Sequence, residues 1–298
     1  MKVAATALLG GRQSKLFDLL ALTKPRLNSL VVITAGISYY LGLTAPMDAS
    51  GLLHTIIGTS LVAGGASALN QVAESDLDET MLRTRERPIP SGRIEPRDAR
   101  VFGLVLTAVG LSQLFYFTNL IAGLVALTTV ASYVLLYTPL KRTTPWSTFI
   151  GAFPGGLPAV LGWTAARGTV TFEALILFAI VFFWQLPHFH ALSWVYREDF
   201  VRAKLPVLAV IDPTGKKTGT HSLIWTVVLI PISLLPLSIN LGGFYYLVFA
   251  TILNVMFLVP AVRFALQRTT ARARLLFHTS LIYLPCLWIL MVTERAFK

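Results

Sequence analysis

Two scarcities in the sequence limit the class of protein. Only 13% of the 298 residues are charged, whereas 55% are hydrophobic, and a soluble domain usually has about 25% charged residues. Cysteine occurs once, as Cys286, which excludes a disulfide within the chain and a metal site built from several cysteines. The composition therefore favours a membrane protein, in which we expect Cys286 to be a small apolar residue of a helix.

Long apolar runs stand where charge is missing. Sheet edges cannot face lipid, so we predict an all-α, polytopic membrane protein, a nine-transmembrane-helix bundle. The polar loops are too short for a separate soluble domain, so residues 1–298 are expected to form a single domain. The windows of about 20 residues that are long enough to span are 27–46, 51–73, 99–118, 119–138, 146–166, 172–196, 221–240, 243–262 and 275–293.

Basic residues are confined to one side of the predicted helices. All lysines and arginines except Arg167, Arg295 and Lys298 fall in the N-terminal tail or in loops after even-numbered helices. This asymmetry predicts a cytoplasmic N-terminus and an outside C-terminus, in a bacterial or archaeal cytoplasmic (inner) membrane. Topology and contacts with membrane lipid then account for the net charge of +11, so nucleic acid is not expected as a partner. The short apolar run before Arg12 is interpreted as a mature cytoplasmic tail.

Acidic residues gather at the cytoplasmic ends of two predicted helices, although topology does not require them there. In "NQVAESDLDETMLRTRERPIPSGR", Asn70, Glu74 and Asp78 share one face if the helix continues through 78. An amide oxygen and two carboxylates suit Mg²⁺, which often takes substrate phosphates as further ligands. Arg83 and Arg87 follow at the same spacing, and arginine binds phosphate bidentately. The stretch predicts a metal–diphosphate site, with a solvated, self-paired loop as the alternative. The acids expected to point elsewhere and to pair with local arginines are Asp76 and Glu79.

A second cluster, "YREDFVRAKLPVL", repeats the order of acids, bases and proline. Glu198 and Asp199 come first, and Arg202 and Lys204 follow. Two such clusters facing one cavity could hold two metal ions against one diphosphate. Further cationic contacts, with a topology role as the alternative, are predicted from Lys24, Arg26, Lys141 and Arg142.

Two predicted helices carry unusual residues inside the membrane. The run "GAFPGGLPAVLGW" favours a kink and close helix packing, with a cavity lining as the alternative. In "FWQLPHFHALSW", His188 and His190 lie on opposite sides of a helix and cannot bind one metal ion together. An intramembrane histidine is a functional candidate, so His188 is predicted either to contact a substrate or to pack through a hydrogen bond.

At these motifs the chain resembles a known family. The stretch that begins at Asn70 resembles the first signature of the UbiA superfamily of intramembrane prenyltransferases. The runs "LTKPRL", "YTPLKRTTPWSTFIGAFPGGLPAVLGW", "WQLPHFHALSWVYREDF" and "LPVL" resemble, in order, the branch of that superfamily that farnesylates haem. The resemblance covers most of the chain and implies a nine-helix bundle with cytoplasmic catalytic loops. It implies a transferase that joins farnesyl diphosphate, a vinyl group of haem B and water, and that yields haem O and diphosphate.

The resemblance also implies roles for single residues. Asn70, Glu74 and Asp78 match the first metal–diphosphate motif, with Glu74 where many members have Asp. Asp199 matches an acid of the second motif, which lacks here the second acid four residues later. Lys141 matches a basic residue near the diphosphate. The expected cofactor is Mg²⁺, and its expected ligands are Asn70, Glu74, Asp78 and Asp199. The other residues expected to bind substrates are Lys24, Arg26, Arg83, Arg87, Glu198, Arg202, Tyr137, Phe153, Trp184 and His188.

The implied reaction passes through an allylic farnesyl cation. Tyr137, Phe153 and Trp184 are expected to stabilise this cation through their aromatic faces. A prenyltransferase for a quinone precursor or chlorophyllide shares the diphosphate motif and is the alternative enzyme. A cation-coupled transporter is the alternative from another class, but its charges would lie near the midplane of the membrane. The expected partners are membrane lipid, haem B and farnesyl diphosphate, with a haem A synthase or oxidase assembly factors.

Overall fold

The computed structural model describes residues 15–44 and 46–297, so the N-terminal tail predicted for the segment before Lys15 lies outside the described residues. Every regular element within those ranges is a helix. In chain order these are α1 (Lys15–Leu22), α2 (Pro25–Gly42), α3 (Ala49–Ala73), α4 (Ser75–Thr80), α5 (Pro96–Phe117), α6 (Leu120–Ala131), the π-helix η1 (Ser132–Tyr137), α7 (Thr138–Leu140), α8 (Ser147–Arg167), α9 (Phe172–Val195), α10 (Arg197–Arg202), α11 (Leu208–Ile211), α12 (Lys216–Leu234), the 3₁₀ helix η2 (Leu235–Ile239), α13 (Phe244–Leu266) and α14 (Thr270–Ala296).

Eight of these helical segments are long and apolar enough to cross a membrane, counted over residues 15–44 and 46–297. The prediction of an all-α polytopic protein is therefore met, but the ninth span is not confirmed. The missing one is α2, whose 18 residues include Arg26, Asn28 and two tyrosines and are less apolar as a result. The eight spans are Ala49–Ala73, Pro96–Phe117, Leu120–Leu140, Ser147–Arg167, Phe172–Val195, Lys216–Ile239, Phe244–Leu266 and Thr270–Ala296.

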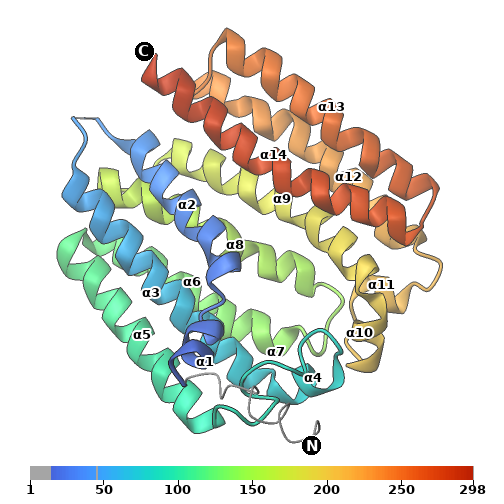
Figure 1. Cartoon of the computed structure of the whole chain (residues 1–298). Helices are drawn as coiled ribbons and strands as arrows, with labels where there is room; N and C mark the ends of the chain where they lie inside the picture. Colours follow the sequence, from blue (N-terminus) through green and yellow to red (C-terminus); the bar gives the residue numbers. More distant parts are fainter. Residues whose placement is uncertain (1–14, 45, 298) are drawn as a thin grey trace, which may run out of the picture.

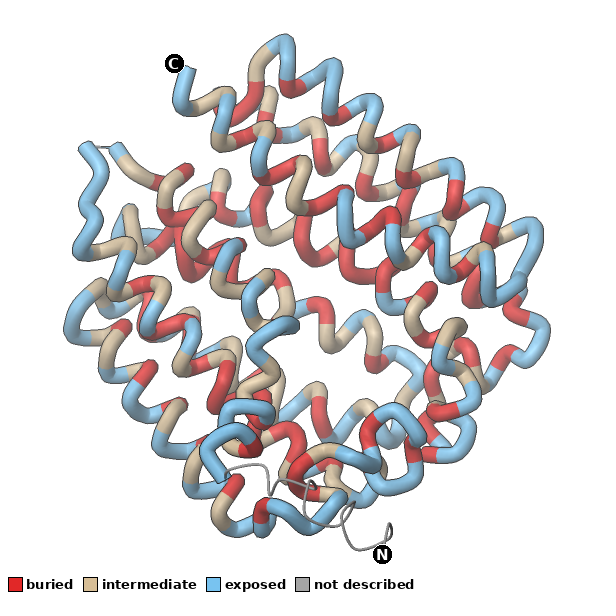
Figure 2. The backbone as a smooth tube through the Cα atoms, in the orientation of Figure 1, coloured by how far each residue is buried: buried red, intermediate tan, exposed pale blue. Residues whose placement is uncertain are grey.

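The helices form two groups that meet at α8 and α9. On one side α3 packs against α5 and α2, and α6 packs against α8. On the other side α12 and α14 pack against α9, and α13 packs against α12 and α14. The interior of the bundle is buried, and the outward helix faces are exposed in the pattern expected of lipid-facing surfaces (Figure 2). Close approach of α2 and α8 requires Gly162, because a Cβ there would collide with the backbone carbonyl of Ala35. The helix α8 runs unbroken through Pro154 and Pro158.

The two ends of the bundle differ in architecture. The short helices α1, α4, α7, α10 and α11 gather at one end, away from the C-terminus (Figure 1). At the opposite end the side chain of Arg167 donates to the carbonyl of Gly42, and Arg295 donates to the carbonyls of Leu41 and Leu43. These guanidinium groups bind the C-terminal carbonyls of α2, where the helix leaves acceptors without internal partners.

Candidate active site

The first acidic motif lies where α3 gives way to α4. The expected continuous helix through 78 is wrong, because Glu74 leaves the helical conformation (φ −108°, ψ 11°) and separates the two helices. The hydrogen-bond ladder nevertheless continues: Glu74 N donates to Asn70 O, and Asp78 N donates to Glu74 O, both at 2.9 Å. All three side chains remain buried, and Asp78 is only 1% exposed.

Each member of this motif is paired with a cation from a different segment. Lys24 Nζ, just before α2, lies 3.3 Å from Asn70 Oδ1. Lys141, at the end of α7, donates to both carboxylate oxygens of Glu74 at 3.0 Å. Arg87, in the turns that follow α4, donates to Asp78 Oδ2 at 2.7 Å. The structure thus brings together basic residues that the sequence could only name as separate candidates.

The site has more basic side chains than its two carboxylates can neutralise. Burial, followed by the positive charge of Arg87, lowers the pKa of Lys24 to about 7. Burial and the charge of Arg87 also lower the pKa of Arg83. Neighbouring positive charges that depress one another's pKa make the site a favourable place for an anion.

A threonine that sequence reasoning missed fixes the orientation of the Asn70 amide. Asn70 Nδ2 donates to Thr138 Oγ1 at 3.1 Å, and this hydroxyl donates to Tyr133 O at 2.8 Å. The carbonyl is offered by the π-helix η1, an element that often marks functional sites. With its nitrogen held by Thr138, Asn70 turns its oxygen toward Lys24. The sequence offered no signal that singles out Thr138, because the same span also contains Thr128, Thr129 and Ser132.

Of the two acids of the second cluster, Asp199 contacts the segment that follows the first motif and Glu198 does not. Asp199 is buried and accepts from Leu82 N at 3.0 Å and from Arg202 at 2.9 Å. The side chain of Glu198 is 91% exposed and only approaches Arg202, at 3.7 Å. The guanidinium of Arg83 lies 5.0 Å from the ring centroid of Tyr196, which sequence reasoning also missed. The expectation that Glu198 lines the site is not supported by this placement.

Some predicted residues lie apart from this cluster. Arg26 is exposed at the start of α2. Asp76 points away, as predicted, and pairs at the surface with Arg142 at 2.6 Å. This hydrogen-bonded pair lowers the pKa of Asp76 and raises that of Arg142. Glu79 is also exposed.

Of the three aromatic candidates, Tyr137 alone lies beside the first motif. Its ring stacks on that of Tyr133, with centroids 5.5 Å apart. The missing side chain of Gly151 in α8 leaves room for the Tyr137 ring, because a Cβ at Gly151 would lie 2.6 Å from that ring. Phe153 lies on the other side of α8 from Gly151, because a helix turns by about 200° over two residues. There it contacts the ring of Phe178 and is 43% exposed.

Trp184 and His188 form part of the packing between α9 and α14. The indole of Trp184 donates to Ser280 O at 2.8 Å and stacks on His188 at 5.0 Å. His188 Nδ1 shares a hydrogen bond with Ser280 Oγ at 2.7 Å, which corresponds to the packing alternative. His190 instead faces His221 of α12, so the prediction that the two histidines point apart is confirmed.

Comparison with known proteins gives the site its context. The model of the UbiA prenyltransferase family matches residues 29–282. The chain belongs to the UbiA prenyltransferase family. It is 44% identical to a protoheme IX farnesyltransferase of Solibacter usitatus, over 93% of this chain and 98% of that protein. It is 36% identical to the mitochondrial protoheme IX farnesyltransferase of Arabidopsis thaliana, over 95% of this chain and 66% of that protein.

Solved structures of other proteins share the UbiA fold. A digeranylgeranylglyceryl phosphate synthase superposes with a TM-score of 0.79 at 19% identity, covering 95% of this chain and 99% of that one. A UbiA homologue from Archaeoglobus fulgidus, solved with GPP and Mg²⁺, superposes with a TM-score of 0.64 at 11% identity, covering 92% and 99%. At these identities the likeness establishes the fold, and the prediction of a UbiA-like all-α bundle is confirmed.

The oxygen donors of this UbiA site fit a hard cation such as Mg²⁺. Asp78 Oδ1 is buried and accepts no hydrogen bond from the residues that the structure describes, and Glu74 and Asn70 offer further oxygens. Within the described part of the chain, no three side chains of His, Cys, Asp and Glu form a ready metal cluster. A metal ion here would therefore draw on the Asn70 amide and on the phosphate oxygens of a substrate to complete its shell.

Proposed function

We propose that this membrane prenyltransferase transfers the farnesyl group of farnesyl diphosphate to a vinyl group of haem B, with addition of water, and yields haem O and diphosphate. The observation that carries the proposal is the buried oxygen face of the first motif, surrounded by Lys24, Arg87 and Lys141. Curated relatives that match nearly the whole chain bear the name of this activity, which supports haem as the acceptor.

The first step is departure of the diphosphate. Asn70, Glu74 and Asp78 would hold Mg²⁺, which supplies positive charge to the leaving group when bound. The basic residues compensate the charge that develops as the bond between the farnesyl C1 and oxygen breaks. In this step Lys141 and Arg87 exchange their carboxylate contacts for phosphate oxygens, which arginine binds bidentately and lysine binds as a point charge. Asp199 completes the site as a further carboxylate.

The second step is carbon–carbon bond formation. The vinyl π electrons bond to farnesyl C1, and positive charge moves to the vinyl carbon next to the porphyrin. Water adds to that carbon, and its proton passes to the released diphosphate, which is a sufficient base. Tyr137 and Tyr133 present stacked rings beside the carboxylate motif and can stabilise the allylic cation without trapping it.

We further propose that α2 is a ninth span. At 1.5 Å per residue its 18 residues extend about 27 Å, close to the thickness of a bilayer core. It packs against α3 and α8, starts beside the active site at Lys24 and ends at the carbonyls that Arg295 binds. The concentration of basic residues around the short helices supports a cytoplasmic active site and N-terminus, in a cytoplasmic membrane. Haem O would pass to a haem A synthase or to oxidase assembly factors.

The proposal is tested by product identity. Membranes containing the chain, from a host that makes haem B and no haem O, receive farnesyl diphosphate and Mg²⁺. Extracted haems are then identified by mass. We expect a farnesylated, hydrated haem together with equimolar diphosphate, formed about a hundredfold or more slowly by the Asp78→Asn variant. A prenylated quinone precursor with unchanged haem B would contradict the proposal.

A further inference from the structure

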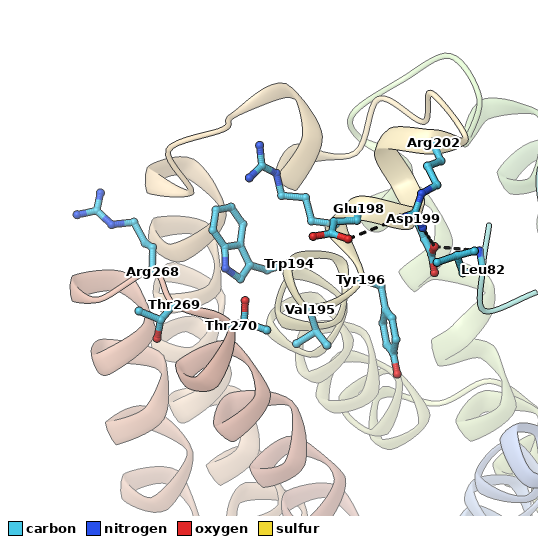
Figure 3. Close-up of a pocket in the computed structure, with 11 residues that line it drawn as sticks. Leu82, Trp194, Val195, Tyr196, Glu198, Asp199, Arg202, Arg268, Thr269 and Thr270 are labelled. Carbon is cyan, nitrogen blue, oxygen red and sulfur yellow. Dashed lines mark hydrogen bonds and ion pairs between the residues drawn. The ribbon is translucent and has the colours of Figure 1, made fainter. Parts of the chain in front are cut away.

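A separate pocket lies next to the second motif, at the end of the bundle where the short helices gather. Its volume is about 670 Å³, and its walls come from the end of α9, from α10 and from the turn between α13 and α14. In Figure 3, Trp194 stands between Arg268 and Thr269 on one side and Glu198 and Asp199 on the other. The volume is in the range of small-molecule sites.

Two arginines of this pocket carry charge that no carboxylate compensates. Arg197 and Arg268 both line it, and neither has an acidic partner within ion-pair distance among residues 15–44 and 46–297. Arg197 lies over the ring of Trp194, 5.3 Å from its centroid, and its Nε is buried with no hydrogen-bond partner in the described part of the chain. Arg202, by contrast, pairs with Asp199 at 2.9 Å. Guanidinium groups without a carboxylate partner favour an anion, so an anionic ligand in the pocket would stabilise this arrangement.

The pocket shares a wall with the diphosphate site. Leu82 and Asp199 line the pocket and are joined by a hydrogen bond of 3.0 Å. Tyr196 also lines the pocket, and the guanidinium of Arg83, which follows the first motif, lies over its ring. A ligand in the pocket is therefore separated from the prenyl donor site by the thickness of these side chains.

We propose that this pocket binds the propionate carboxylates of the porphyrin acceptor, through Arg197 and Arg268. This inference rests on the proposed function and adds to it the means by which the acceptor is oriented. Guanidinium groups bind carboxylates bidentately, and the indole face of Trp194 and the side chain of Val195 offer apolar contact to a ring edge. The propionates of haem B lie on the edge of the macrocycle opposite the vinyl groups. With its propionates anchored here, the macrocycle would extend past the shared wall, so that its vinyl edge lies on the side of the prenyl donor.

The test compares Arg197→Gln and Arg268→Gln with a matched control, Arg274→Gln, an exposed arginine of the same end of α14 that does not line the pocket. Two ligands are titrated into each purified protein and followed by their absorbance: haem B and its dimethyl ester, which lacks both carboxylates. The KM values for haem B and for farnesyl diphosphate are measured in parallel. Arg197→Lys keeps the charge and serves as a second variant if the glutamine variant is unstable.

We expect each glutamine variant to bind haem B roughly tenfold or more weakly, as for loss of a charge-assisted hydrogen bond. The KM for farnesyl diphosphate and the affinity for the dimethyl ester should stay at the wild-type value, and Arg274→Gln should resemble wild type throughout. Unchanged haem affinity in both variants, or equal wild-type affinity for haem and its ester, would overturn the inference. A rise in the KM for farnesyl diphosphate alone would assign the pocket to phosphate instead. Because these titrations measure binding, a wild-type protein that makes no haem O refutes the proposed function separately.

Discussion

Replacement of Asp78 by asparagine separates its part in the fold from its part in the chemistry. Asp78 is 1% exposed and pairs at 2.7 Å with Arg87, whose side chain is 23% exposed. At a charge separation of about 4 Å and an effective dielectric constant near 20, the attraction is about 4 kcal/mol. Desolvation cancels much of it, so we expect a coupling of about 2 kcal/mol in a double-mutant cycle with Arg87→Met.

The catalytic loss should be larger and should not follow that cycle. Asp78 Oδ1 is buried and accepts no hydrogen bond within residues 15–44 and 46–297, so it is the oxygen of this residue most able to bind a metal ion. Loss of its negative charge removes about 3 kcal/mol of transition-state stabilisation, which slows turnover by a factor of roughly 100 or more. The Asp78→Asn/Arg87→Met double variant should recover thermal stability in detergent but not activity.

The assay is haem O formation in membranes with matched amounts of folded protein, judged by the elution volume and melting temperature of the purified variants. Titration with Mg²⁺ shows whether higher metal concentration restores part of the activity of Asp78→Asn, as expected for a weakened ligand set. Turnover of folded Asp78→Asn within a factor of about three of wild type would refute the assignment of this carboxylate to the catalytic site.

Three further outcomes follow from the geometry. Thr138→Val should slow turnover about tenfold and raise the Mg²⁺ concentration needed, because the Asn70 amide loses its fixed orientation, whereas Thr138→Ser should retain activity; equal activity of both in a kcat measurement would contradict this role. Glu74→Gln should lose activity by a factor of roughly 100, while Asp76→Asn, which breaks only a surface ion pair, should change it less than about fivefold; side-by-side rates decide. A cysteine at Ser91 should react with an impermeant thiol reagent from the cytoplasm and one at Met47 from the opposite face, in a Cys286→Ser background, and labelling of both from one face would exclude a spanning α3, the helix between them.

The helices could be predicted from sequence because a bilayer demands about 20 consecutive apolar residues, a strong local signal. Every predicted window overlaps one of the long helices. The break at Glu74 was not visible, because the hydrogen bonds that carry the chain past it are local and the deviation is a single residue's backbone angles. The weaker apolar character of α2 was visible but was outweighed by the length of the window.

The site was predictable in its residue types and less so in its contacts. The shared face of Asn70, Glu74 and Asp78 could be predicted, because side chains four residues apart lie on the same side of a helix. The pairing of Glu74 with Lys141 joins residues 67 positions apart, so only the packing of helices determines it. Phe153 was misplaced for a reason the sequence did contain: Gly151 two residues earlier marks the face of α8 that admits the tyrosine ring.

The far end of α2 has a consequence for how the protein is made. Arg295 binds the carbonyls of Leu41 and Leu43, groups 254 and 252 residues earlier in the chain. During synthesis α2 leaves the ribosome long before α14, so the carbonyls of Leu41 and Leu43 must wait for Arg295 until the last described helix has entered the membrane. The carbonyl of Gly42 gains its partner, Arg167, earlier, together with α8. Until α14 arrives, the helix that carries Lys24 to the active site lacks part of the contacts at its far end. In nascent chains stalled before α14, the segment around Leu43 should therefore be cut by protease more readily than in the full chain.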